Sequence, residues 1–246
     1  MAETIEVTLP VMLHSDEEPE IFLRAKERLE ALGEESGVPL KVSAFLPFLP
    51  GRSRTPEGFA KQLENQARHR LPIALVETGV QGNNALSYVR GDPTYQENLP
   101  SDLEKTIEQT ARIRDLDSSP REGLVVAPHV GVLVVDSMRP GDFSRPSLYS
   151  TADFLGMRER IYAATKARFA HLADFAKARG LKFSLENAYL AVVEDSTFWR
   201  QQSSNGPVQL HYQVFNDLDS LMDISEGNLV FDAAHLAAMT NVPARF

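Results

Sequence analysis

The sequence predicts an α/β fold in which parallel strands are joined by crossover helices. Apolar runs of strand length alternate with longer segments of helical period, and the helical segments carry start and stop signals. A chain of 246 residues with 43% hydrophobic content can bury one substantial core. A single domain over residues 1–246 is therefore expected, in which 1–37 forms either the first βα unit or an addition before it. Strands are expected at about 5–12, 38–47, 72–79, 123–135, 181–187 and 228–233.

The expected helices are identified by residues that favour helix ends and, in one case, by a clear apolar stripe. The first should begin near Pro19 and end at Gly33, since proline is favoured in a first helical turn and glycine just past a last one. The clearest helical period runs from Phe154 to Phe175, where apolar residues recur at three and four positions, and Gly180 follows. We expect this stripe to be buried.

Two connections are longer than a compact α/β unit needs. They cover about 136–151 and 188–216, and each follows the carboxyl end of a predicted strand. Long excursions in compact domains often cover a site, and α/β folds build their sites at the carboxyl ends of their strands. These two segments are therefore expected to border any functional site.

The composition of the chain limits which kinds of partner and which metal ligands are expected. A net charge of −9, with no long cluster of Lys and Arg, disfavours nucleic acid. No run approaches the roughly 18 apolar residues that a membrane span needs, and the N-terminus lacks the pattern of a secretory signal. A cytoplasmic protein without a membrane partner is expected. Because there is no cysteine, any bound metal must be held by Asp, Glu, His or water.

Two neighbouring strands are predicted to deliver acidic side chains at their carboxyl ends. The strand at 181–187 ends in Glu186 and Asn187, and the strand at 228–233 ends in Asp232, with His235 three residues later. Oxygen and imidazole ligands from adjacent strand ends suit a divalent metal such as Mn²⁺, Mg²⁺, Co²⁺ or Zn²⁺. The alternative is that these acids cap helices or lie solvated in loops.

The segments that carry these residues resemble one family. Leu185–Asn187 followed by Phe231–His235 resembles the fourth and fifth strand ends of the sugar phosphate isomerase/epimerase (xylose isomerase-like) barrels. Leu124–Gly131 is similar to the third strand of that family, and Val76–Gly79 to its second. The resemblance covers about residues 72–240.

This resemblance implies a (β/α)8 barrel of the TIM type, with about five or six βα units present in the chain. The family takes a further histidine and glutamate from strands six to eight, whereas this sequence stops at Phe246, so an incomplete barrel is expected. The expected partners are a small-molecule sugar substrate and, through an open sheet edge, further copies of the chain in a homo-oligomer.

Carried over residue by residue, the resemblance implies a metal-dependent isomerase or epimerase that transfers a proton through an enediolate. Glu186 and Asp232 are implied metal ligands, and Glu186 is also the implied general acid/base. Contacts to substrate are expected from four residues, in which Trp199 either covers a sugar face or simply packs its loop. They are His235, His129, Asn187 and Trp199.

Two other functions stay open at this point. In the endonuclease IV branch of the same barrel superfamily, a histidine resembling His129 binds zinc, which would make the chain a multi-zinc phosphodiesterase. His129 could equally line a sugar pocket or be a histidine satisfied by neighbouring backbone. The third interpretation is a catalytically incomplete fragment that has kept the fold and lost the site.

Overall fold

The computed structural model divides the chain into two compact units. The first comprises Met1–Gly79, Glu104–Ala127 and Phe175–Phe183, and the second comprises Val80–Leu103, Pro128–Asp174 and Ser184–Phe246. Within the residues described, no helix is both long and apolar enough to cross a membrane. The structure describes residues 4–13, 16–48, 56–78, 86–90, 102–117, 123–138, 151–187, 199–201, 208–213, 215 and 217–232.

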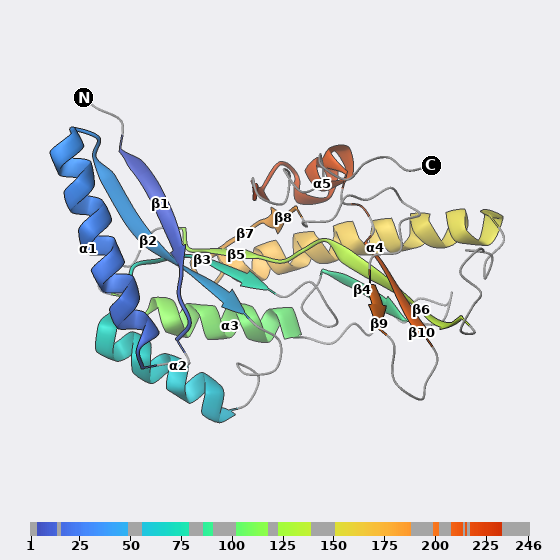
Figure 1. Cartoon of the computed structure of the whole chain (residues 1–246). Helices are drawn as coiled ribbons and strands as arrows, with labels where there is room; N and C mark the ends of the chain where they lie inside the picture. Colours follow the sequence, from blue (N-terminus) through green and yellow to red (C-terminus); the bar gives the residue numbers. More distant parts are fainter. Residues whose placement is uncertain are drawn as a thin grey trace. The chain divides into compact units, whose positions relative to one another are not determined.

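The first unit is built on a five-stranded parallel sheet (Figure 1). Its strands lie in the order in which they occur along the chain, so each neighbour is reached by a crossover connection, as the sequence predicts. Strand interiors are apolar and buried, including Val42, Ala44, Val76 and Val126. The strands are β1 (Ile5–Pro10), β2 (Leu40–Phe48), β3 (Ile73–Thr78), β5 (Val125–Ala127) and β7 (Lys182–Phe183).

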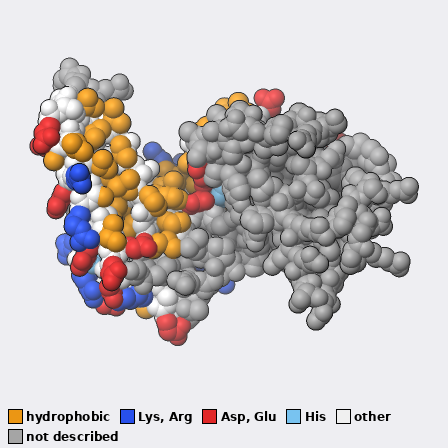
Figure 2. Space-filling model, in the orientation of Figure 1, with side chains coloured by type: hydrophobic (Ala, Val, Ile, Leu, Met, Phe, Trp, Pro, Cys, Tyr) orange, Lys and Arg blue, Asp and Glu red, His pale blue; other side chains and the backbone are white. Residues whose placement is uncertain are grey.

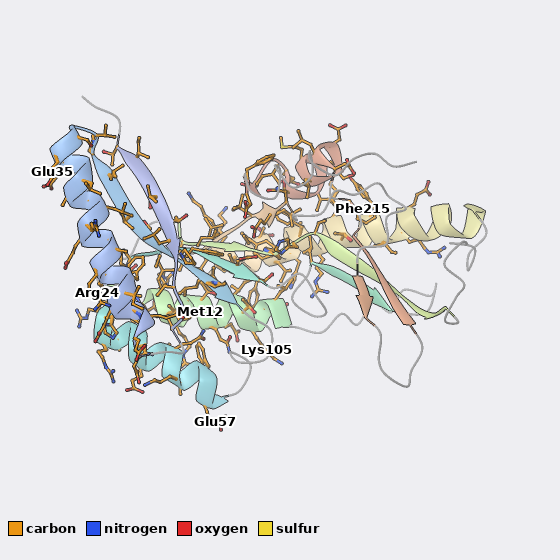
Figure 3. The ribbon with its side chains drawn as sticks, viewed as in Figure 1. Met12, Arg24, Glu35, Glu57, Lys105 and Phe215 are labelled. Carbon is orange, nitrogen blue, oxygen red and sulfur yellow. The ribbon has the colours of Figure 1, made fainter. Side chains whose placement is uncertain are left out.

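Helices follow the strands at the expected places. They are α1 (Glu18–Ser36), α2 (Pro56–His69), α3 (Asp102–Arg114) and α4 (Thr151–Lys177). The backbone N–H of Met12 donates to the Glu18 carboxylate at 2.8 Å, which holds the chain just before α1 (Figure 3). Of the predicted stripe on α4, Ile161, Phe169 and Leu172 are buried, whereas Ala164 and Phe175 are half-buried.

The prediction that α1 ends at Gly33 is wrong. The helix continues to Ser36 and ends at Gly37, whose φ of 69° is the left-handed conformation that glycine adopts readily. Gly33 is instead a point of close approach between α1 and the strand that follows. A Cβ atom at this position would lie 2.6 Å from the carbonyl oxygen of Val38 and 2.8 Å from Cγ of Leu40. The glycine thus serves packing rather than termination.

Among the strands that the structure describes, β1 lies at the edge of the first unit's sheet, and its Ile5 is exposed. Further apolar side chains are exposed on α1 and on the turn that follows it, and Figure 2 shows hydrophobic side chains gathered over this unit. An edge strand bordered by apolar surface favours association. The exposed set on these elements comprises Ile5, Ile21, Leu32 and Val38.

The second unit contains a mixed sheet that the sequence analysis did not predict. Its strand order is β4-β6-β10-β9, with β4 parallel to β6 and the other two pairs antiparallel. The region predicted as one strand at 123–135 is therefore two strands in two sheets, and the connection at 188–216 contains two strands. The strands are β4 (Ser87–Arg90), β6 (Gly131–Met138), β9 (Trp199–Gln201) and β10 (Val208–Gln213).

A two-stranded parallel ladder completes the second unit. It pairs β8 (Leu185–Glu186) with β11 (Leu229–Val230), and α5 (Leu218–Ser225) precedes β11. The predicted parallel arrangement is confirmed: β3 pairs with β5, β5 with β7, and β8 with β11. Strand pairs of this length contribute few ladder hydrogen bonds, so side chains must help to hold them.

Side-chain contacts tie α5 to α4. Asp223 accepts hydrogen bonds from Lys166 Nζ and from the Tyr162 hydroxyl, each at 2.7 Å. The Tyr162 ring also packs edge-on against Phe215, which is labelled in Figure 3, and the ring centroids are 5.0 Å apart. The hydrogen bonds from Lys166 and Tyr162 hold the pKa of Asp223 below its usual value of 3.8.

We predict that Gly33→Ala destabilises the protein although alanine is the better helix former. The gain in helix propensity is about 1 kcal/mol, but the clash with Val38 and Leu40 forces the helix and strand apart, at a cost of roughly 1–3 kcal/mol. The free energy of unfolding from urea titration measures the balance. Gly37→Ala is the control, since nothing lies within 4 Å of its added Cβ and only backbone strain remains. A Gly33→Ala protein as stable as the parent would contradict this role for the glycine.

We predict that Asp223→Asn lowers the melting temperature at neutral pH and has no effect in strong acid. A carboxylate with a lowered pKa stabilises the fold fully above its unfolded value of 3.8, and this stabilisation is lost as the pH falls through the folded pKa. Melting curves of both proteins from pH 7 to pH 2 test this. Asp219→Asn, on the same helix, controls for the change in net charge, and a pH-independent difference would contradict the assignment.

Candidate metal centre

His129 is fixed by its backbone just beyond β5. It forms an isolated parallel bridge with Glu186, and its carbonyl accepts a hydrogen bond from the N–H of Leu86 at 2.9 Å. The preceding Pro128 has no N–H to contribute to a ladder, but its carbonyl accepts from the N–H of Glu186 at 3.0 Å. The histidine is only 2% exposed. Main-chain contacts to two other segments therefore hold this residue.

Glu186 is held on its other side by β11. Its ladder partner there is Val230, and the N–H of the preceding Leu185 donates to the carbonyl of Asn228 at 2.9 Å. The residue is 4% exposed, although an ionised carboxylate is costly to bury without a proton or a counter-charge. A buried glutamate at a strand end, beside a buried histidine, indicates a functional site more strongly than an exposed acid would.

Glu77 brings a second carboxylate to the same group. It is the penultimate residue of β3 and pairs in register with Ala127, which is two residues before His129. In the part of the chain that the structure describes, Glu77, His129 and Glu186 form a group of possible metal ligands, with one ligand atom from each within 4.8 Å of the others. A His/Glu/Glu group of this kind can hold a metal ion.

The chemistry of the donor set fits a divalent cation. Two carboxylates and one imidazole are ligands that Mn²⁺, Mg²⁺, Co²⁺ and Zn²⁺ all accept. Ligand distances of about 2.0–2.6 Å place two ligands of one ion at most about 4–5 Å apart, and the ligand atoms of this group lie within 4.8 Å of one another, which is compatible with one shared ion. A cation would also offset the mutual repulsion of the two carboxylates.

The structure brings together some of the site residues predicted from the sequence and not others. Glu186 and His129 are brought together, whereas Asp232 is described but is not a member of the three-residue group. The Asp232 backbone instead forms two hydrogen bonds with the buried side chain of Asn187. Trp199 begins β9 opposite His211, and only its backbone is described. His235 lies outside the described residues.

The sequence analysis did not single out Glu77 as a site residue, although the signal was present. Glu77 lies at the carboxyl end of a predicted strand, which is the same arrangement that drew attention to Glu186 and Asp232. Glu186 and Asp232 are each accompanied by an amide or a histidine, whereas Glu77 is a single acid on an earlier strand. Its strand-end position is nevertheless the same signal.

Comparisons with known proteins return similarity at the level of structure only. No family model matches the sequence, and the search of curated proteins finds no match. A solved structure from Anabaena variabilis, provisionally described as a sugar phosphate isomerase/epimerase, has a TM-score of 0.48 and 16% identity, over 96% of this chain and 66% of that one. A xylose isomerase domain protein from Planctomyces limnophilus has a TM-score of 0.38 and 14% identity, over 94% of this chain and 64% of that one.

The chain is similar to these two structures and spans less than two thirds of the length of either. Its own sheet supports the α/β fold class directly, with sequential parallel strands and helices between them, as in an incomplete barrel of the TIM type. At such low identity and TM-score, conclusions about activity depend on the residues of this chain.

We predict that Mn²⁺ raises the melting temperature of the parent protein and that His129→Ala removes most of this increase. An ion that binds only the folded state stabilises it by about 2.7 kcal/mol at a hundred times its dissociation constant. Thermal melts in EDTA and in excess Mn²⁺ measure the shift. The matched control is His171→Ala on the exposed face of α4, which should keep the full increase. An equal Mn²⁺ effect in the two variants would rule out His129 as a ligand.

Proposed function

We propose that this chain is a divalent-metal-dependent enzyme, or the metal-binding part of one, that moves a proton between adjacent carbons of a sugar or sugar phosphate. The observation that carries the proposal is the group of Glu77, His129 and Glu186, in which two residues are almost fully buried. The resemblance of the strand-end segments to isomerase and epimerase barrels supports the substrate class. The described donor set supports the metal.

In this proposal the chain's own residues divide two tasks. Glu77 and His129 would hold the cation together with one carboxylate oxygen of Glu186. The other Glu186 oxygen would take the proton from the carbon beside the carbonyl and return it to the neighbouring carbon, while the hydroxyl proton of the first carbon passes to the former carbonyl oxygen. When bound, a divalent cation polarises the substrate carbonyl and stabilises developing negative charge. Because main-chain contacts on both sides fix Glu186, its carboxylate can keep one orientation through both proton transfers.

The residues expected from the sequence complete the proposed site. Asp232 would supply a further ligand, and His235, Asn187 and Trp199 would contact the sugar. Self-association through the open β1 edge is part of the same proposal, since further strands or a second copy would cover the exposed apolar surface described above.

One observation favours a second candidate function. The metal-capable group includes His129, which is the ligand that an endonuclease IV-like phosphodiesterase requires. Such an enzyme needs two or three zinc ions, whereas an isomerase site of the proposed kind needs one. Metal analysis of the purified chain therefore distinguishes the two. A chain that binds no metal would instead be a fragment without a working site.

We predict that the Mn²⁺-loaded protein exchanges the hydrogen beside the carbonyl of a suitable aldose or ketose with solvent deuterium. Proton NMR of a panel of sugars and sugar phosphates in D₂O measures the loss of signal. Glu186→Gln should lower the exchange rate by about 100-fold or more, since a positioned general base contributes typically 10²–10⁴. Glu159→Gln, on the exposed surface of α4, should leave the rate unchanged.

Each result of this experiment bears on the proposal. Exchange that depends on both Mn²⁺ and Glu186 supports it. No exchange with any sugar in the panel by a protein that binds Mn²⁺ would overturn the enzymatic function, and exchange that survives Glu186→Gln would overturn the role of Glu186.

A further inference from the structure

The side chain of Asn187 forms a two-point contact with the backbone of Asp232. Its Nδ2 donates to the carbonyl oxygen of Asp232 at 3.1 Å, and its Oδ1 accepts from the N–H of Asp232 at 2.7 Å. Asn187 is only 3% exposed, so water competes little for these hydrogen bonds. A side-chain amide has the same donor and acceptor as a peptide group. Here it pairs with a backbone as a neighbouring strand would.

This contact lies where the strand ladder has ended. The β8–β11 pairing comprises Leu185 with Leu229 and Glu186 with Val230, and Asp232 lies two residues beyond the last pair. The intervening Phe231 is 51% exposed, so its side chain is not anchored in a core. The ladder alone would therefore leave the Asp232 peptide free to turn. The Asn187 amide extends the pairing to this peptide.

We propose that Asn187 is a positioning residue that fixes the Asp232 peptide beside the strand that ends in Glu186, so that the Asp232 carboxylate, which is not one of the three residues of the metal-capable group, would reach an ion held there. This inference rests on the proposed metal site and adds to it, because it assigns to Asn187 a role beyond contact with a substrate. Residues that orient metal ligands typically change affinity by about 10- to 100-fold when they are removed. Asn187 should act on the metal only through Asp232.

Three variants separate this role from general stability. Asn187→Ala removes both hydrogen bonds, and Asn187→Asp keeps an acceptor for the Asp232 N–H but sets a carboxylate oxygen against the Asp232 carbonyl. Asn228→Ala is the matched control at the other end of β11. It removes an asparagine whose Nδ2 donates to the Ser225 carbonyl at 2.9 Å, and whose position is exposed.

The experiment is a double-mutant cycle on Mn²⁺ affinity, measured by isothermal titration calorimetry on folded proteins. Asn187→Ala and Asn187→Asp should each raise the dissociation constant by about 10-fold or more. In the Asp232→Ala background, Asn187→Ala should add less than about 2-fold, since its only route to the ion is gone. Asn228→Ala should bind as the parent does. Additive effects of Asn187→Ala and Asp232→Ala, or an unchanged affinity in Asn187→Ala, would overturn the inference and leave the proposed metal site intact.

Amide hydrogen exchange of the metal-free protein tests the contact without any metal. The Asp232 N–H should exchange at least about 10-fold faster in Asn187→Ala than in the parent or in Asn228→Ala, because its buried acceptor is lost. Unchanged exchange would overturn the positioning role. If the parent chain binds no Mn²⁺, the proposed function fails together with the affinity part of this inference, while the exchange result still decides whether Asn187 holds the Asp232 peptide.

Discussion

Parallel strand pairing is the constraint on which the candidate site depends. In a parallel sheet every strand runs in the same direction, so the residues that end successive strands emerge at the same edge. β3, β5 and β7 pair in this way, and Glu77, His129 and Glu186 all lie at or just beyond the ends of such strands. Three residues separated by more than fifty positions each can then supply one donor set. No single segment of the chain contains the site.

The sequence analysis predicted the parallel strands because their signals are local. Each strand is an apolar run, each helix shows helical periodicity and residues that favour its ends, and the order of strands follows from crossover connections between sequential parallel strands. A glycine that ends a helix and a glycine that permits close packing look alike in sequence. The predicted helix end at Gly33 was wrong for this reason. Only the approach of Val38 and Leu40 distinguishes them, and that approach is a tertiary property.

The site was predictable in kind but not in geometry. Glu186 and Glu77 each lie at the end of a predicted strand, whereas the position of Glu77 beside His129 depends on the register between β3 and β5, which no local pattern encodes. The split of the region 123–135 has a similar origin. Pro128 cannot donate to a ladder, so β5 stops before it and β6 begins in another sheet. The amide contact between Asn187 and Asp232 also required the strands to be placed side by side.

The bridge between His129 and Glu186 makes the site sensitive to insertions and deletions in β8 but tolerant of substitutions. A deletion of one residue in β8 would turn Leu185 rather than Glu186 toward the histidine, because successive side chains of a strand face opposite ways. Point substitution carries no such penalty. Glu77→His alone would give two imidazoles and one carboxylate, the donor set typical of non-haem iron oxygenases. In evolutionary terms, the frame resists insertions and deletions, while a single amino-acid substitution would change the donor set of the metal-capable group.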